Sequence, residues 1–534
     1  MKLRVLSPFA FALCVHCVGD SSVPAPDGGN DATTDAGLDS ATDATQDVGD
    51  EADAAVPLTG AFGSVLVLPA STLAWSAMTF GSNGDVLLGG ALSDVSGPAL
   101  INGTTFTSKG GNDMLVMKLA PNDGFKWTVD YGGANDDRVN GVAMDAAGNA
   151  YVVGSVDCQT ASGAVAFDVS HSIACSHTGL LSVVAKLNAA DGTIAWLETF
   201  DTASSGTNFC FAAAFDASNG DVTVGCNMLG NISFVDTGST TRTVTHALNA
   251  AGDIFLAELD PATGHVAKSA YLSGSASDSV AKLAYDSAGN LYVVGTTSSS
   301  TLAAYIPATS GSSSFTLSPP ASSSAGFVID LKGSDWSLLW DKAYGASAKN
   351  TSFTSASVDT ANDLYAAGQF NGTVDFGLGG VTAAGSVDGM VVKVTSAGVT
   401  SGVAQFGAAN VNMIGTRVAV DATGDVAVAG YYDAVAAGIK IGGTQLPDSN
   451  GHAYAAYTAK FSSDLKTAIW AQGNSCPTAN APATGIAMSE VAIDPLTQGV
   501  VTFGTLDGPA TTDFGDGKQV TRSGSAIFFL RRAP

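Results

Sequence analysis

The chain has 534 residues, of which 13% are charged and 46% hydrophobic, and its formal net charge is −26. Such an acidic chain lacks the basic footprint that nucleic-acid binding requires, so we expect no nucleic-acid partner. No window of helix length carries apolar residues at helical period, which excludes a helix-rich core and predicts an all-β fold.

An export signal is predicted at residues 1–17. Lys2 and Arg4 precede a short apolar run at residues 5–15, as a charged n-region precedes an h-region. Cys17 stands at the boundary between the apolar run and the polar sequence that follows. This arrangement resembles a bacterial lipoprotein, and the resemblance implies a lipid on Cys17. His16 departs from the small residue that this family has before its Cys. The alternative is cleavage by the ordinary signal peptidase and release as a secreted protein.

An acidic linker is predicted at residues 18–57. Residues 20–56 hold nine Asp and one Glu, and neither Lys nor Arg. Charge of one sign with few apolar residues predicts disorder, so we interpret the segment as a tether. The alternative is calcium binding, which the absence of a ligand-spaced loop with a fixing Gly disfavours.

A repeat of about 62 to 74 residues occupies residues 58–534. Its clearest element has an Asp, a short turn and a β run that ends in Gly, which predicts a hairpin because Asp caps turns and Gly accepts positive φ. The turn Asp recurs at Asp145, Asp216, Asp286, Asp359, Asp421 and Asp494. Residues 80–89 are interpreted as a first copy with Phe80 in the Asp position, which makes seven hairpins.

Two more strands are predicted after each hairpin. The first has a polar penultimate residue, and the variable sign of its charge predicts a solvated strand face rather than a site. These residues are Lys118, Lys186, Glu258, Asp330, Lys393, Lys460 and Arg531. The second often has a Trp and an aromatic residue four positions later, as at Trp127 and Tyr131. Because this pair recurs once per unit, packing between blades is favoured over a carbohydrate platform.

These units predict a single seven-bladed β-propeller of four-stranded blades. The last unit lacks its fourth strand, while residues 62–68 form an orphan strand before the first hairpin. We expect the orphan strand to complete the last blade and close the ring, which removes exposed sheet edges.

The pattern Asp-x-x-Gly-Asn-x-Tyr-Val-x-Gly at residues 145–154 and 286–295 resembles the SBBP-type β-propeller repeat, and more distantly NHL propellers. The resemblance covers about residues 62–534 in seven copies of uneven quality. It implies a bacterial secreted protein or lipoprotein, and it says almost nothing about a ligand.

Cysteines suggest cross-links in an exported chain. Cys210 and Cys226 lie on the two arms of one predicted hairpin, and Cys158 and Cys175 bracket an insertion, so we expect disulfides. One alternative is zinc binding, although close-paired Cys spacing is absent; its ligands would be Cys158, His171, Cys175 and His177. Free thiols are the other alternative, and Cys476 is left over.

The sequence contains no nucleophile elbow, His-Glu-x-x-His or phosphate loop. We therefore expect a non-enzymatic binding or scaffold propeller without cofactor or metal. Its expected ligand is a protein or polysaccharide of the cell envelope or its surroundings. Long loops at 157–178, 298–324 and 473–487 are candidate ligand contacts.

A hydrolase or lyase acting on polysaccharide is the alternative function. Non-repeating His, Arg, Glu or Tyr residues over the central channel would favour it. The expected location is an outer-membrane lipoprotein that faces the periplasm or the cell surface and touches the membrane only through its lipid, or otherwise a secreted protein.

Overall fold

The structure is a computed structural model of the chain. It describes residues 62–69, 73–93, 98–158, 163–175, 178–200, 208–244, 252–308, 313–433, 439–447, 454–474, 486–506, 510–514, 518–522 and 526–534. Pro57–Pro534 form one compact unit. The predicted signal, Cys17, the linker and Cys476 lie outside the described residues. Within the described ranges, no helix is long and apolar enough to cross a membrane.

The main strands form seven antiparallel sheets, which are the blades. Blades 1 and 2 contain β2 (Leu73–Phe80), β3 (Val86–Ser93), β6 (Asn112–Leu119), β7 (Phe125–Tyr131), then β8 (Arg138–Met144), β9 (Ala150–Cys158), β12 (Gly179–Leu187) and β13 (Ile194–Phe200). Blades 3 and 4 contain β14 (Asn208–Phe215), β15 (Val222–Met228), β18 (Asp253–Leu259), β19 (Val266–Gly274), then β20 (Asp278–Tyr285), β21 (Leu291–Thr297), β24 (Ala325–Leu331) and β25 (Leu338–Tyr344). Blades 5 and 6 contain β26 (Thr351–Val358), β27 (Leu364–Phe370), β30 (Asp388–Val394), β31 (Thr400–Phe406), then β32 (Met413–Val420), β33 (Val426–Asp433), β36 (Tyr454–Phe461) and β37 (Ala468–Asn474). Blade 7 contains β38 (Ile486–Ile493), β39 (Val500–Leu506), β42 (Ala526–Arg532) and β1 (Phe62–Pro69).

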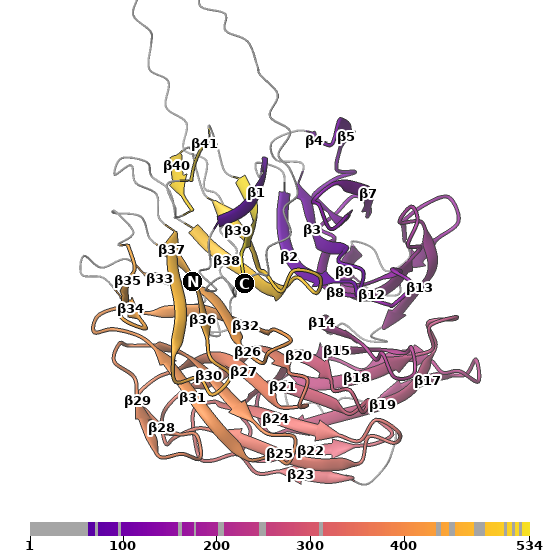
Figure 1. Cartoon of the computed structure of the whole chain (residues 1–534). Helices are drawn as coiled ribbons and strands as arrows, with labels where there is room; N and C mark the ends of the chain where they lie inside the picture. The colour runs from indigo at the N-terminus through magenta and orange to yellow at the C-terminus, as the bar shows by residue number, and fades with distance from the viewer. Residues whose placement is uncertain are drawn as a thin grey trace, which may run out of the picture. The chain divides into compact units, whose positions relative to one another are not determined.

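The blades follow one another around a ring, from indigo β2 to yellow β38 in Figure 1. The first strand of each blade contacts the first strand of the next blade, and β38 contacts β2. The predicted all-β, seven-bladed propeller is therefore confirmed. In blade 7 the fourth place is taken by β1, which pairs antiparallel with β42 from Phe62 opposite Arg532 to Pro69 opposite Ala526.

The hydrophobic core lies between neighbouring blades. All seven residues of β21 and all seven of β24 are buried, because the faces of their sheet are covered by the blades on either side. One apolar cluster joins Ile254 and Leu256 of blade 3 to Val293 and Ile329 of blade 4. Continuous apolar strands, rather than strictly alternating ones, are the expected pattern for sheets buried on both faces.

Bulges on the first strands join the blades near the ring axis. In blades 1, 2 and 5 the extra residue of the bulge is Ser76, Asn140 or Thr354. Its side chain donates a hydrogen bond to a carbonyl of the next first strand, at Val139, Cys210 and Thr416 respectively. The bulges thus turn polar side chains into links between adjacent blades.

Each blade also has a short hairpin between its second and third strands, which we call a rim hairpin. The predicted repeat did not include it. The rim hairpins are β4 (Ala99–Ile101) with β5 (Thr104–Phe106), β10 (Ala164–Ala166) with β11 (Ser172–Ala174), β16 (Ile232–Val235) with β17 (Thr241–Val244), β22 (Leu302–Tyr305) with β23 (Phe315–Leu317), β28 (Thr373–Asp375) with β29 (Gly380–Thr382), β34 (Lys440–Ile441) with β35 (Thr444–Gln445), and β40 (Ala510–Asp513) with β41 (Gln519–Arg522). In Figure 1, β28, β29, β34 and β35 lie at the outer edge of the ring.

Several rim hairpins pack against the outer strand of the preceding blade, as β16 packs against β13. Phe376 packs against Tyr344 in a tilted arrangement, with ring centroids 5.7 Å apart. The hairpin of blade 4 goes further, since β22 pairs with β19 and extends the sheet of blade 3 to six strands. Two proposed ligand loops, 157–178 and 298–324, therefore contain packing elements. Most of the third, 475–485, lies outside the described residues.

Candidate functional site

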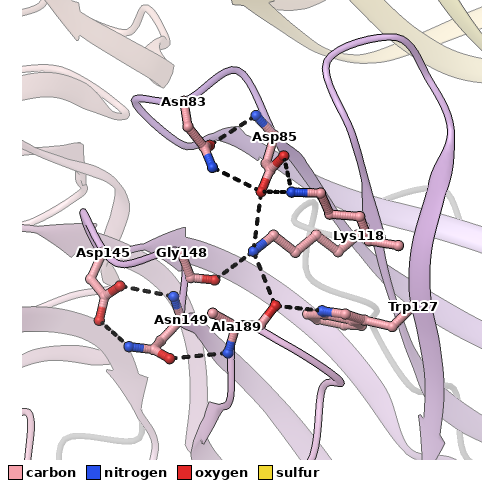
Figure 2. Close-up of polar contacts among 9 residues, drawn as sticks. Asn83, Asp85, Lys118, Trp127, Asp145, Gly148, Asn149 and Ala189 are labelled. Carbon is pink, nitrogen blue, oxygen red and sulfur yellow. Dashed lines mark hydrogen bonds and ion pairs between the residues drawn. The ribbon is translucent and has the colours of Figure 1, made fainter.

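In blades 1 to 6, the turn between the first two strands and the turn between the last two lie at the same end, which we call the turn face; in blade 7 the turn between the first two strands lies there. Figure 2 shows this face in blades 1 and 2. The Asp145 carboxylate accepts the backbone N–H of Asn149 at 2.8 Å and its side-chain amide at 2.9 Å. The Asn149 side-chain oxygen accepts the N–H of Ala189 at 3.0 Å. One Asp thus fixes its own turn and, through Asn149, the neighbouring turn.

The other predicted turn Asp residues make the same kind of contact. In each, a carboxylate oxygen accepts the N–H two positions later, at 2.8 to 2.9 Å. These residues are Asp216, Asp286, Asp359, Asp421 and Asp494. Their carboxylates are engaged within the turns, so the arrangement serves the fold.

Blade 1 corrects the predicted alignment. Phe80 pairs with Val86 as Met144 pairs with Ala150, so Gly81, and not Phe80, occupies the Asp position. The adjacent glycines Gly89 and Gly90 made the sequence register ambiguous by one residue. The carboxylate of this turn comes from Asp85, whose backbone N–H and carboxylate are both held by Asn83 at 3.0 Å.

The predicted solvated face of the third strands is wrong. Lys118 is only 2% exposed, and its ammonium donates to the carbonyls of Gly148 at 2.7 Å and Ala189 at 3.4 Å, both in the next blade. The same ammonium lies 3.3 Å from the Asp85 carboxylate (Figure 2). The residue is buried because the next blade covers the turn, which sequence alone cannot show.

The same kind of pair recurs around the ring, and its burial ranges from partial in blade 2 to complete in blade 6. Turn carboxylates meet a third-strand cation in blades 2, 5, 6 and 7, in the pairs Asp145–Lys186, Asp359–Lys393, Asp421–Lys460 and Asp494–Arg531. Burial by itself would raise the pKa of Asp421, but Lys460 and Thr423 outweigh it and lower that pKa. Arg531 also reaches Asp123 of blade 1 at 2.8 Å, which joins the last blade to the first.

Blades 3 and 4 carry an acid where the others carry a base. In blade 3, Glu258 pairs instead with Lys268 of the fourth strand at 2.8 Å, and burial raises the pKa of Glu258 although Lys268 opposes this. A cavity of about 350 Å³ lies here, lined among others by Asp216, Asp221, Glu258 and Lys268. In blade 4, Asp330 is 2% exposed and no described cation pairs with it.

The Trp residues also join blades. The indole N–H of Trp127 donates to Ala189 at 3.0 Å, that of Trp196 to Pro261 at 3.1 Å, and that of Trp340 to Ser396 at 2.9 Å. Each acceptor is a carbonyl in the neighbouring turn of the following blade. These indoles are therefore used in packing between blades, in agreement with the prediction from their recurrence.

Both expected disulfides are present. Cys158–Cys175 closes the base of the rim hairpin of blade 2, and Cys210–Cys226 joins β14 to β15. The disulfide removes both thiolates from the alternative zinc site, whose His171 contacts Asp168 at 2.9 Å and whose His177 lies outside the described residues. Among the described residues, no group of three or more His, Cys, Asp or Glu side chains is placed to hold a metal ion.

The central channel contains a second cavity, of about 290 Å³, lined by first strands of blades 1, 4, 5, 6 and 7. Its charged lining residues are Lys282 and Glu490, among apolar neighbours such as Met78 and Val418. Blades 4 and 7 lie on opposite sides of the ring, so these opposite charges stand on facing walls.

Lys282 and Glu490 occupy the same place in their blades, directly after the bulge of the first strand. Strand register puts Ala77, Gly141, Ala212, Lys282, Ser355, Arg417 and Glu490 at this place. Arg417 donates to the Ser489 carbonyl at 3.1 Å. The sequence pattern did not point to this set, because the first strands are aligned only when their bulges are known.

Comparison with known proteins supports the repeat. Residues 268–302, which include β20 and β21, match the family model described as SBBP, beta-propeller repeat. A search of curated proteins finds no significant match.

Three solved structures are among those that this chain matches. The Dos1 propeller is 9% identical with a TM-score of 0.37, over 89% of this chain and 95% of that chain. A quinohemoprotein alcohol dehydrogenase from Pseudomonas putida HK5 is 11% identical with a TM-score of 0.34, over 86% and 76%. A protein of unknown function from Dyadobacter fermentans DSM 18053 is 8% identical with a TM-score of 0.32, over 88% and 98%. The chain therefore contains an SBBP-type β-propeller repeat at residues 268–302, within a ring of seven blades.

Proposed function

We propose that this chain is an exported binding propeller, anchored by a lipid on Cys17 and the linker at residues 18–57, whose channel receives part of an envelope protein or polysaccharide. The observation that supports binding is the set of charges on the channel wall. Four of the seven equivalent places carry only Ala, Gly or Ser, so the fold does not require Lys282, Arg417 or Glu490 there.

A charged side chain on the channel wall loses part of its hydration, which the polar groups of a ligand can replace. Lys282 and Glu490 are half-buried and form no ion pair with each other, and each presents a polar group to the same cavity. A peptide or a sugar chain offers both hydrogen-bond donors and acceptors, so it could bind Lys282 on one wall and Glu490 on the other at the same time.

Export is supported by the two disulfides, because such bonds form and persist in oxidising compartments. The lipid on Cys17 rests on the sequence pattern at residues 1–17 alone. Labelling cells with a radioactive fatty acid, with Cys17→Ser as the comparison, distinguishes the anchored protein from the secreted one.

A pull-down from envelope extract with residues 57–534 tests binding, scored separately for protein and polysaccharide. The matched variant carries Lys282→Ala and Glu490→Ala, and the control carries Lys466→Ala, an exposed lysine on the turn face. We expect one specific partner, recovered with the control and lost with the channel variant. Recovery of no partner, or equal recovery with the channel variant, contradicts the proposal.

A hydrolase or lyase acting on polysaccharide is the second candidate, since Arg417 and Glu490 are non-repeating residues near the channel. If it is correct, envelope polysaccharide incubated with residues 57–534 gains reducing ends, and Glu490→Gln abolishes the gain. Binding without release of reducing ends excludes this candidate for the polysaccharide tested.

A further inference from the structure

A third-strand cation occupies an equivalent place in several blades, at the turn face. Lys118 lies between its own turn carboxylate and two carbonyls of the next blade, those of Gly148 and Ala189. Lys186 repeats the contact with Pro261 at 2.8 Å, and Lys393 repeats it with Ser463 at 3.3 Å. The ammonium group is thus surrounded by oxygen atoms, which belong to the turn carboxylate of its own blade and to backbone carbonyls in turns of the next blade.

Blade 4 keeps these surroundings without the cation. Asp330 pairs with Tyr292 and Trp340 as Lys186 pairs with Tyr151 and Trp196. The equivalent oxygens are the Asp286 carboxylate and the carbonyls of Asn362 and Ser396. The Asn362 carbonyl accepts a hydrogen bond from the Tyr292 hydroxyl at 2.8 Å, and the Ser396 carbonyl accepts one from the Trp340 indole at 2.9 Å. The two turns that surround this position are therefore held as in other blades.

One oxygen of the buried Asp330 side chain lacks a hydrogen-bond partner, although the Trp340 indole contributes a hydrogen bond to this carboxyl group. Asp330 is 2% exposed, and its Oδ1 has no hydrogen-bond partner among the described residues. Blade 3 also has an acid at this position, Glu258, but there Lys268 supplies the missing positive charge. Lys268 contacts Glu258 and donates a hydrogen bond to the Gly333 carbonyl. In the described part of blade 4, no lysine or arginine forms an ion pair with Asp330 or Asp286, and an unpaired buried charge is costly.

We propose that a calcium ion binds between blades 4 and 5, in the place that a lysine ammonium holds in other blades. Calcium prefers carboxylate and carbonyl oxygens, and water completes its shell of six to eight ligands. Asp286 and Asp330 supply two carboxylates, so a doubly charged ion balances them. Asn362 and Ser396 supply carbonyls from the following blade, so the ion links two blades as the ammonium does elsewhere.

Terbium luminescence and thermal unfolding of the full chain test the proposal. Terbium ions replace calcium and emit when a nearby Trp or Tyr is excited, which Trp340 and Tyr292 provide. The linker at residues 18–57 has no aromatic residue, so terbium bound there gives no sensitised emission. We expect sensitised emission that calcium displaces, and a calcium-dependent rise of the unfolding temperature by about 2 to 5 °C at pH 8.

Two variants and a control decide the assignment. Asp330→Asn is expected to lower the emission at least tenfold and to remove the calcium effect, whereas Asp464→Asn, on an exposed turn, changes neither. Asp330→Lys is expected to unfold at or above the wild-type temperature in EDTA and to ignore calcium. Absence of emission and of a calcium shift in the wild type, or their persistence in Asp330→Asn, overturns the proposal.

Discussion

At the scale of single residues, the positions that repeat in every blade serve contacts between blades. The turn Asp holds its own turn, and in blades 1, 2, 5 and 7 a third-strand cation connects a turn carboxylate to the next blade, as Lys118 does in Figure 2. Both partners are withdrawn from water, so each depends on the other for compensation of its charge. Removal of one partner is therefore more harmful than removal of both.

The Lys460–Asp421 pair provides the clearest test, because Lys460 is fully buried and lies 2.7 Å from the carboxylate. Lys460→Met leaves Asp421 charged and unpaired, so we expect a loss of about 3 to 5 kcal/mol in the free energy of unfolding. Lys466→Met, at a lysine 79% exposed, is expected to cost less than about 1 kcal/mol. Denaturant titration measures both.

The double variant Lys460→Met with Asp421→Asn serves as the control for charge. It removes the uncompensated carboxylate, so we expect it to recover part of the loss seen with Lys460→Met alone. If Asp421→Asn lowers the unfolding free energy of the Lys460→Met variant further, instead of raising it, the result contradicts the interpretation as a buried ion pair.

Asp330 gives stability a defined dependence on pH. Its pKa is about 7 in the folded protein and near 4 in an unfolded chain, so between these values only the folded state holds the proton. Its contribution is complete below about pH 4 and is lost as pH rises through 7. In EDTA, we expect Asp330→Asn to flatten the fall in unfolding free energy from pH 5 to 7 by up to about 1.4 kcal/mol per pH unit.

Several other carboxyls titrate in the same direction and remain in the variant, and two of them have large shifts. Burial is the first cause that raises the pKa of Asp137 to about 7 and that of Asp278 to about 6. The comparison is therefore between slopes, and equal slopes for wild type and Asp330→Asn refute the assignment. Asp464→Asn should keep the wild-type slope, because the pKa of Asp464 is lowered and its titration ends below this range.

At the scale of elements, the rim hairpins hold the outer edges of the blades. Phe376 is fully buried between Tyr344 of the preceding blade and Phe370 of its own. The hairpin is short, yet its Phe376 ring packs on Tyr344 of the outer strand of blade 4. This explains why loops that looked like insertions in the sequence contain paired strands.

Phe376→Ala tests this role. A large apolar side chain lost from a buried place leaves a cavity, and we expect a loss of about 3 to 5 kcal/mol in the free energy of unfolding. Leu378→Ala changes an exposed residue, 57% accessible, at the tip of the same hairpin and should cost under about 0.5 kcal/mol. Equal effects in thermal or denaturant unfolding contradict the packing role.

Sequence patterns predicted the main hairpins and missed the rim hairpins for a physical reason. The main strands run seven to nine residues with a turn signal at one end, as at Asp286 and Gly289, so their pattern is repeated and local. Rim strands are two to four residues long and too short for a period to appear. Only their tight turns left a trace, for example Asn102 and Gly103 at positive φ.

At the scale of the whole molecule, blade 7 is assembled from both ends of the described chain. Its first three strands come from the C-terminal part, and β1 adds the fourth through seven paired residues beside β42. Such a strand covers the open edge of β42. Its contribution to closing the ring is a prediction that truncation can test.

Deletion of residues 57–70 removes β1 and leaves the edge of β42 unpaired. We expect a lower unfolding temperature and self-association, because an open strand edge is a template for pairing with another chain. Deletion of residues 18–56 leaves β1 in place and should change neither property. Light scattering after gel filtration and thermal unfolding report the two effects, and a stable monomer without β1 contradicts the closing role.

The sequence by itself determined the fold class, the seven repeats, the turn Asp residues and the two cysteine pairs, because each depends on neighbours along the chain or on recurrence. It did not determine the burial of Lys118 or Asp330, since their cover comes from the following blade, some 30 to 70 residues away. Nor did it bring Lys282 and Glu490 together across the channel, because only closure of the ring makes two distant blades face each other. Recurrence reveals what every blade needs, and tertiary structure decides where individual blades differ.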